Sequence, residues 1–360
     1  MTAPEACEII KRAVCAALPN AEVVSLPIAD GGEGSALSIT GACGGKMINA
    51  DVCGPYFGEK VSAAYGVLPS GTAVIEVASC AGISLAEGRL SAADTTTYGV
   101  GELILHAAES GAKKIFICLG GSATNDGGCG MAAALGARFF CGGAEFVPTG
   151  RTLSKIDGID VSKIKKVLRG VEFFALCDVK NPLYGKDGAA YVFAPQKGVR
   201  NGETEMLDAG LRHLAAVLKK DVGKDISNIE GAGAAGGLGG GAAAFLGAKP
   251  TSGIERILDV LRFDEHLAGA DLVITGEGCA DAQSVCGKAV SGVAARATAA
   301  GVPVMCVAGK IGDGADALYG IGVTDIVQTS RAGAPFDEIK ATCRNDLFRA
   351  VKTAVERKFM

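Results

Sequence analysis

Residues 120–130 read Gly-Gly-Ser-Ala-Thr-Asn-Asp-Gly-Gly-Cys-Gly, with five glycines in eleven positions. An apolar run at 114–119 precedes them and predicts a buried strand, and the small residues at 131–135 predict the start of a helix. Glycine lets the backbone approach a ligand closely, because it has no Cβ and adopts positive φ at little cost. N–H groups at such a junction attract anions. The segment therefore predicts a loop that binds phosphate.

The polar residues of this loop extend the prediction. Hydroxyl and amide groups can bind phosphoryl oxygens, and a carboxylate can bind Mg²⁺ or a substrate hydroxyl. Asp126 is a candidate Mg²⁺ ligand, and the predicted nucleotide- or substrate-binding residues are Gly120, Gly121, Ser122, Thr124, Asn125, Asp126 and Gly127. The alternative is an ordinary Asn-Asp turn whose glycines only permit close packing.

The segments around the loop predict an α/β fold. A helical pattern begins after Thr95-Thr96-Thr97, each a possible N-cap, and ends at Gly111, just before the strand at 114–119. Strand-helix-strand order implies parallel strands joined by a right-handed crossover. The loop then lies at the carboxyl end of a parallel strand, where open α/β sheets bind their ligands.

A second glycine-rich junction, at 29–35, reads Ala-Asp-Gly-Gly-Glu-Gly-Ser and follows a predicted strand at 21–28. Its two carboxylates would repel a phosphate unless a metal ion or a hydroxyl lay between them. We therefore assign Gly31 and Gly32 to substrate or Mg²⁺ binding, and we treat Asp30 as a candidate catalytic residue.

Two other features each allow two interpretations. Residues 231–241 are rich in glycine and have no polar side chains, so they are either a source of backbone amides or a flexible hinge. Glu76 lies inside the apolar strand predicted at 72–78, where it either faces solvent or serves a nearby site.

Charged residues follow two more predicted strands. Asp178 follows the strand predicted at 172–177 and is either a catalytic carboxylate or a cap, while Lys197, in the loop at 194–198, is a candidate partner for phosphate. The strand at 271–275 leads into Gly276, Glu277 and Gly278, and then to Asp281 and Lys288. Carboxylates that hold Mg²⁺ or accept a proton, together with a lysine that offsets charge, are what phosphoryl transfer requires. We therefore predict Asp178, Asp281, Lys288 and Asp30 as catalytic, residues 276–278 as nucleotide-binding and Glu277 as a second candidate Mg²⁺ ligand.

Composition excludes several classes of protein. The chain has 360 residues, 49% of them hydrophobic and 21% charged, and its net charge is −4. These values indicate a globular protein long enough for two domains. The basic residues are scattered, which argues against nucleic acid or a membrane surface as partner. We expect a cytoplasmic protein, because no signal peptide is evident and the cysteines fit reduced thiols.

The sequence resembles the bacterial type-1 glycerate kinases, also called glycerate 2-kinases. The resemblance extends over nearly the whole chain and rests on residues 29–34, 95–99, 120–128, 177–178, 181–182, 195–198, 272–283 and 287–288. It implies Mg²⁺-dependent transfer of the γ-phosphoryl group of ATP to D-glycerate, which gives 2-phosphoglycerate. It also implies a monomer or homodimer.

The resemblance further implies two α/β domains, with mainly parallel sheets flanked by helices and the active site in the cleft between them. We expect residues 1–70 and 268–360 to form a Rossmann-like domain. Residues 71–267 would form the second domain, which carries the loop at 120–130.

Two departures from the family pattern leave alternatives open. Family members usually begin with an additional strand and an Asp-Ser-Phe-Lys loop, and they have an arginine where this chain has Cys279. The missing strand would leave an unpaired position in the sheet. A thiol cannot bind a carboxylate or phosphate bidentately as arginine does. The alternatives are a kinase for another small hydroxy-acid and a catalytically impaired nucleotide- or metabolite-binding homologue.

Overall fold

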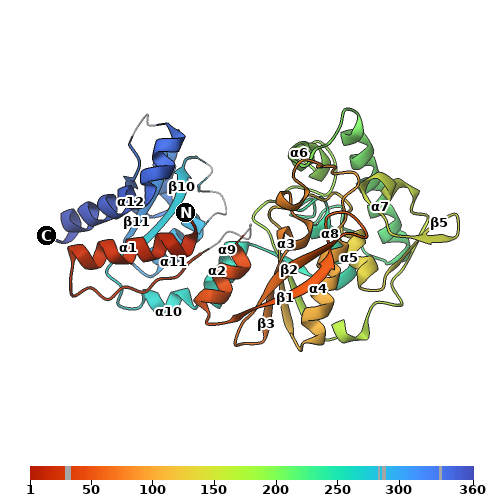
Figure 1. Ribbon diagram of the computed structural model, residues 1–360, viewed down its shortest axis with the longest axis horizontal. Coiled ribbons are helices and arrows are strands. Elements are labelled where there is room, and N and C mark those ends of the chain that lie inside the picture. Colours follow the sequence, from red (N-terminus) through yellow and green to blue (C-terminus); the bar gives the residue numbers. More distant parts are fainter. Residues whose placement is uncertain (29–33, 283, 286–288, 332–334) are drawn as a thin grey trace. The chain divides into compact units, whose positions relative to one another are not determined.

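The computed structural model describes all residues except 29–33, 283, 286–288 and 332–334, and it divides into two compact units (Figure 1). Residues 1–30 and 254–360 form one unit, and residues 31–253 form the other. The first unit is discontinuous, and its boundaries are not those expected for the domains, 70/71 and 267/268. The hairpin at 46–67 belongs to the larger unit because it pairs with the sheet of that unit.

The larger unit contains a six-stranded sheet in the order β1-β2-β3-β4-β8-β9. Its first three strands are antiparallel neighbours, and β3, β4, β8 and β9 run parallel. The strands are β1 (Lys46–Cys53), β2 (Lys60–Val67), β3 (Thr72–Glu76), β4 (Lys114–Cys118), β8 (Glu172–Leu176) and β9 (Lys249–Thr251). This arrangement confirms the predicted parallel strands of an α/β fold.

The helices of this unit are α2 (Ser35–Ala42), α3 (Ala78–Ala81), α4 (Tyr98–Glu109), α5 (Cys129–Ala134), α6 (Ala189–Phe193), α7 (Glu203–Asp221) and α8 (Leu238–Leu246). Of these, α2, α3, α4 and α8 contact the six-stranded sheet, whereas α7 packs in a separate core with Phe139 and Ile159. A small second sheet contains β5 (Arg138–Cys141), β6 (Ala144–Phe146) and β7 (Gly158–Asp160). The leucines of α7 form a buried stripe, in which Leu207, Leu211, Leu214 and Leu218 are each 0% exposed. Four short 3₁₀ turns complete the unit: η1 (Ser84–Ala86), η2 (Gly150–Lys155), η3 (Lys166–Leu168) and η4 (Pro195–Lys197).

The smaller unit is a parallel sheet of β10 (Val273–Ala280), β11 (Val304–Ile311) and β12 (Val323–Gln328). The side chains of β11 alternate between two cores, as expected for a strand buried on both faces. Met305 and Val307 pack against α1 (Ala3–Ala17) and α12 (Phe336–Phe359), which lie side by side in Figure 1. Cys306 packs into the opposite core. The remaining elements are α9 (Gly253–Val260), α10 (Phe263–Leu267), α11 (Ala289–Ala299) and η5 (Ala315–Ile321).

The strand predicted at 21–28 is absent from the sheets of the described residues. The chain there has no regular secondary structure, although Leu26 and Ile28 pack against the core of the smaller unit. Within the described residues, β10 forms one edge of the three-stranded sheet, so its backbone pairs with β11 on one side only. Residues 21–28 are half-buried or exposed, with Val24 54% exposed, so their apolar pattern reflects partial packing on this core and no strand pairing.

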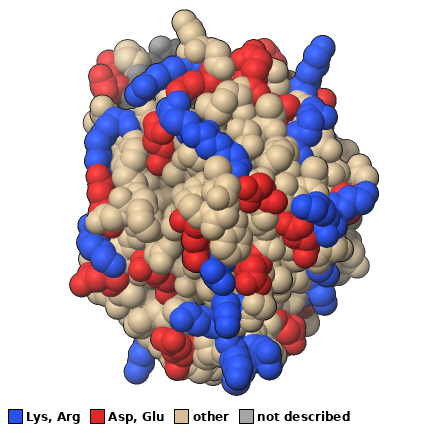
Figure 2. Space-filling view, turned by 90° about the vertical axis from the view of Figure 1, so that its right-hand side faces the viewer, with Lys and Arg blue, Asp and Glu red and all other residues tan. Residues whose placement is uncertain are grey.

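Two further observations concern the charges on the surface and the apolar character of the helices. Figure 2 shows acidic and basic side chains interspersed over the face that it draws, without a continuous region of one sign. In the part of the chain that the structure describes, no helix combines the length and the apolar character needed to cross a bilayer.

Candidate functional site

Three parallel strands of the larger unit end side by side. In their register Glu76 of β3 pairs with Cys118 of β4, and Cys118 pairs with Leu176 of β8. Because parallel strands place their carboxyl ends at one sheet edge, the loop after β4 and Asp178 after β8 lie at the same edge. Burial raises the pKa of Cys118, and the charges of Glu76 and Asp178 add to this increase. The edge therefore combines a glycine-rich loop with two carboxylates.

Asp126 holds the second half of the loop in place. Its Oδ2 accepts hydrogen bonds from Thr97 N at 2.7 Å, Thr97 Oγ1 at 2.9 Å and Gly130 N at 3.1 Å. Its Oδ1 accepts one from Gly128 N at 3.0 Å. Burial raises the pKa of Asp126, whereas these donors stabilise the charged form and oppose the increase. The carboxylate thus joins the start of α4 to the start of α5.

The first half of the loop has unused hydrogen-bonding groups. Within the described residues, the N–H groups at Gly120, Gly121, Ser122, Thr124 and Asn125 donate no hydrogen bond. The Asn125 side chain is 0% exposed, and neither Oδ1 nor Nδ2 has a partner in the described part of the chain. Leaving such a buried group unpaired costs about 1–3 kcal/mol, so a ligand or an ordered water would be expected to satisfy it.

Lys197 lies beneath this half of the loop. Its Nζ donates to Ser122 Oγ and to Thr124 O, both at 2.9 Å, and the residue is 2% exposed. Burial lowers the pKa of Lys197 to about 7, although the charge of Asp126 opposes the change. These contacts use two of the three N–H donors of the ammonium group, and the role of Lys197 as a partner of phosphate stays a prediction.

The glycine-rich segment at 231–241 packs against the loop. Gly127 N donates to Gly236 O at 3.0 Å, and a Cβ on Gly236 would lie 1.9 Å from Thr124 O. The amides of Gly237, Gly239 and Gly240 donate to carbonyls of the same segment. Its glycines therefore permit close packing, and the two predicted interpretations, a hinge or a source of binding amides, both stay predictions.

Glu76 and Asp178 both cap chain segments. Glu76 is 8% exposed and accepts hydrogen bonds from Gly34 N at 3.2 Å and from Ala36 N at the start of α2. The interpretation of Glu76 as a solvent-facing residue is therefore wrong. Asp178 Oδ1 accepts hydrogen bonds from Gly253 N at 2.9 Å and Ser252 Oγ at 3.2 Å. The capping contact predicted as one alternative for Asp178 is thus present.

The strand predicted to end at residue 275 continues through residues 276–278, which belong to β10. Gly276 pairs with Val307 and Glu277 pairs with Ala308, so the segment is extended and does not form a concave group of N–H donors. Glu277 Oε1 is buried and has no partner among the described residues. After the strand, Asp281 N donates to Ser284 Oγ at 3.0 Å. The candidates Asp30, Gly31, Gly32 and Lys288 lie outside the described residues.

The two candidate Mg²⁺ ligands differ in how well they fit a metal ion. Both carboxylate oxygens of Asp126 accept hydrogen bonds in a fully buried position, which does not fit a metal ligand. Glu277 keeps one oxygen without a donor in the described part of the chain, which does fit. The described residues contain no group of three or more His, Cys, Asp or Glu side chains that suits a metal ion.

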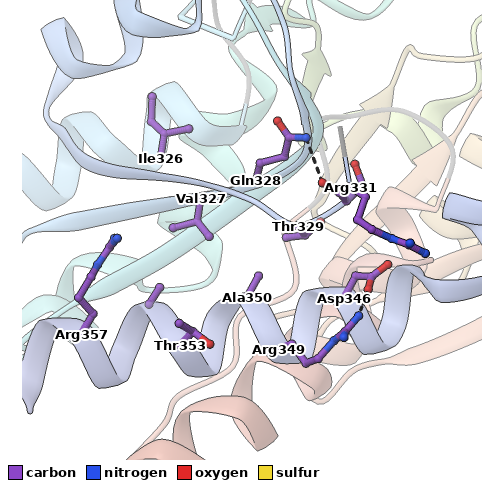
Figure 3. A pocket seen from close by; sticks show the side chains of 12 residues that line it. Ile326, Val327, Gln328, Thr329, Arg331, Asp346, Arg349, Ala350, Thr353 and Arg357 are labelled. Atoms are coloured by element: carbon purple, nitrogen blue, oxygen red, sulfur yellow. Dashed lines mark hydrogen bonds and ion pairs between the residues drawn. The ribbon is translucent and has the colours of Figure 1, made fainter. Parts of the chain in front are cut away.

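A cavity of about 800 Å³ lies in the smaller unit, between β12 and α12 (Figure 3). Ile326, Val327 and Ala350 line it together with Arg331, Arg349 and Arg357. Arg349 forms an ion pair with Asp346 there, and this pair also lines the cavity. None of the described residues that were predicted as functional from the sequence contributes to this cavity.

Two threonines hold the loop in ways that the sequence analysis missed. Thr95 Oγ1 donates to Ala123 O at 2.8 Å, and Thr97 supplies both of the shortest contacts to Asp126. The run at 95–97 predicts helix caps and belongs to a segment that carries the family resemblance, but neither indicates these contacts. Thr97 occupies the N-cap position of α4 without making a side-chain cap, because its hydroxyl group donates to Asp126.

Comparison with known proteins relates this geometry to a family. The family model described as glycerate kinase family matches residues 1–358. A glycerate kinase of Bacillus cereus is 43% identical over 94% of this chain and 89% of its own length. The glycerate 2-kinase of Escherichia coli K12 is 41% identical over 97% of this chain and 92% of its own length. A crystal structure from Salmonella typhimurium LT2, provisionally designated glycerate kinase 2, superposes with a TM-score of 0.85 at 36% identity, covering 99% of this chain and 93% of that one. The chain therefore belongs to the glycerate kinase family.

Proposed function

We propose that this protein is a glycerate kinase that transfers the γ-phosphoryl group of ATP to a hydroxyl of D-glycerate and releases ADP. Family membership and the name of the E. coli relative support a 2-phosphoglycerate product. The proposal is carried by one observation in the first half of the loop. There, several backbone N–H groups and the side-chain amide of Asn125 have no hydrogen-bond partner among the described residues. Such a cluster of donors suits phosphoryl oxygens.

In this reaction a bond forms between the acceptor hydroxyl oxygen and the γ-phosphorus, while the bond from that phosphorus to the β–γ bridging oxygen breaks. The charge on the transferred group is spread over its oxygens, so positioning and hydrogen-bond donors supply most of the catalysis. We assign this role to the N–H groups of Gly120, Gly121 and Ser122 and to Asn125. The acceptor proton passes to a carboxylate, for which Asp30, Asp178 and Asp281 remain the candidates, with Lys288 as electrostatic support.

We retain Mg²⁺ as the metal cofactor, with Glu277 as its protein ligand, because Glu277 Oε1 lacks a donor among the described residues. The ion would neutralise charge on the nucleotide phosphates. Asp126 is no longer proposed as a ligand, because its oxygens already bind Thr97, Gly128 and Gly130.

The test is a coupled assay of ADP release by the purified protein. We expect ADP to form with D-glycerate at a kcat/KM at least tenfold above that with other C3 and C4 hydroxy-acids. Phosphorus NMR of the product distinguishes the 2-phosphate from the 3-phosphate. Preference for another hydroxy-acid would establish the first alternative, in which Cys279 has changed the acceptor site. Cys279 is exposed on β10, as such a role requires.

The second alternative, an impaired binding protein, predicts a different pair of results. ATP would raise the melting temperature, as any ligand of the folded state does, and no ADP would appear with any acceptor. The proposed activity requires both the stabilisation and the product.

A further inference from the structure

Lys197 is a buried lysine whose side chain contacts the loop at two points. Its Nζ donates to Ser122 Oγ and to Thr124 O, both at 2.9 Å, and these two acceptors flank Ala123 in the loop. Ser122 and Thr124 are 4% and 0% exposed. The lysine therefore holds both ends of a three-residue segment that leads directly into Asn125.

The backbone that carries Lys197 is itself held in place. Gly198, which follows it, has φ of +76°, and a Cβ there would lie 2.5 Å from Leu90 O, so other residues would be strained. Ala194 is 0% exposed and packs in a small core with Ala92, Ala93 and Leu207. The lysine thus extends from a rigid support to the loop.

Stability does not explain a lysine at this position. Removing an ammonium group from water carries a penalty of several kcal/mol, which its hydrogen bonds and the charge of Asp126 only offset. An apolar side chain of similar volume is often equally stable in such a place. A buried lysine at this position, despite this penalty, fits a need for specific geometry in the segment that it binds.

We propose that Lys197 is a positioning residue, which fixes Ser122 and Thr124 and thereby orients Asn125 and the N–H groups of residues 120–122 toward the ligand. This inference rests on the proposed function for its effect on catalysis. Its geometric part, the ordering of the loop, holds for any ligand. The competing role is direct contact between Lys197 and a phosphate.

A double-mutant cycle tests whether Lys197 acts through Ser122. We expect Lys197→Met to lower kcat/KM at least tenfold and Ser122→Ala to lower it at least threefold. The double variant should lie within about 1.5-fold of Lys197→Met, whereas independent effects would place it at least threefold lower, because residues that share one interaction are not additive. Multiplicative effects would overturn the proposal. Lys219→Met is the matched control, because Lys219 is exposed and pairs with Asp225, and it should change kcat/KM less than twofold.

Hydrogen exchange without substrates tests the geometric part independently of activity. Ala123 N and Gly127 N form backbone hydrogen bonds in the loop, so peptides over 119–131 report its order. We expect these peptides to exchange at least tenfold faster in Lys197→Met, while peptides from β3 and α7 remain unchanged. Unchanged exchange in the loop, or a uniform increase throughout the protein, would overturn the proposal.

The same measurement on Ser122→Ala decides the question if Lys197→Met does not fold. We expect at least threefold faster exchange of the loop peptides, and unchanged exchange would overturn the proposal.

The outcomes also separate this inference from the proposed function. A wild-type protein that releases no ADP contradicts the function and leaves the exchange result valid. An active wild-type protein with unchanged loop exchange in the variants contradicts the role of Lys197 alone.

Discussion

The segments at 120–130 and 276–278 are both rich in glycine at the end of an apolar run, yet they fold differently. In the first, Gly121, Gly127 and Gly128 have φ of 74°, 62° and 78°, so the chain turns in ways that other residues avoid. In the second, Gly276 and Gly278 extend a strand. A Cβ on Gly276 would lie 2.3 Å from Val307 O. Glycine is needed there because the two backbones lie close together. Glycine thus marks either a turn or close packing, and its neighbours in space decide which.

The largest expected difference between the two segments concerns their carboxylates. Asp126→Asn should lower the free energy of unfolding by about 3 kcal/mol, because an amide group would face N–H donors in a buried site. Glu277→Gln should change it by less than about 1 kcal/mol, since Glu277 Oε1 has no donor to lose among the described residues. Urea unfolding of both variants measures the difference. Equal losses would show that the loop depends on Asp126 no more than the strand depends on Glu277.

Replacing one glycine of each segment by alanine should give the next largest difference in the free energy of unfolding. Gly127→Ala should lower the free energy of unfolding by about 2 kcal/mol, because the residue has positive φ and a Cβ would lie 2.3 Å from Leu214 Cδ2. Gly278→Ala should change it by less than about 0.5 kcal/mol, because no atom lies within 4 Å of a Cβ there. Thermal unfolding followed by circular dichroism is sufficient. A destabilised Gly278→Ala would contradict the assignment of Gly278 to an open position on β10.

Asn125→Ala separates binding from stability in the loop. It should lower kcat/KM at least tenfold, equivalent to about 1.4 kcal/mol, if Asn125 contacts the transferred group. The free energy of unfolding should change by less than about 1 kcal/mol, because the amide makes no hydrogen bond with the described residues. Full activity would remove Asn125 from the site. A large loss of stability would instead indicate a structural role.

The smallest effect is a pH dependence that belongs to the loop. The pKa of Lys197 is lowered from 10.5 to about 7 by burial, so between these values the unfolded chain binds more protons than the folded one. This group therefore adds stability as pH rises through that window and adds none below about pH 7. From pH 6.5 to 8 the gain should be about 1 kcal/mol, or a melting temperature higher by roughly 2–4 °C. Lys197→Met should lack this increment, and an identical pH dependence in both proteins would contradict the burial of a titrating lysine.

The sequence predicted the fold class well because apolar periodicity reports burial directly. The strands β3, β4 and β8, the hairpin of β1 and β2, and the leucine stripe of α7 all follow from local patterns. Residues 21–28 show the limit of this reasoning, because the same apolar pattern is found there without strand pairing. Pairing needs a neighbouring strand, which a local pattern does not reveal.

By itself, the sequence determined which residue types lie at the strand ends, and the resemblance across the chain indicated the glycerate kinase family. The tertiary structure decided what each group does. It commits Asp126 to Thr97, Gly128 and Gly130, places Lys197 beneath the loop and leaves Asn125 without a partner among the described residues. Thr97 and Asp126 are 29 positions apart, and Ser122 and Lys197 are 75 apart. Hydrogen bonds between such residues depend on how the chain packs, because proximity in space at these separations is created only by folding.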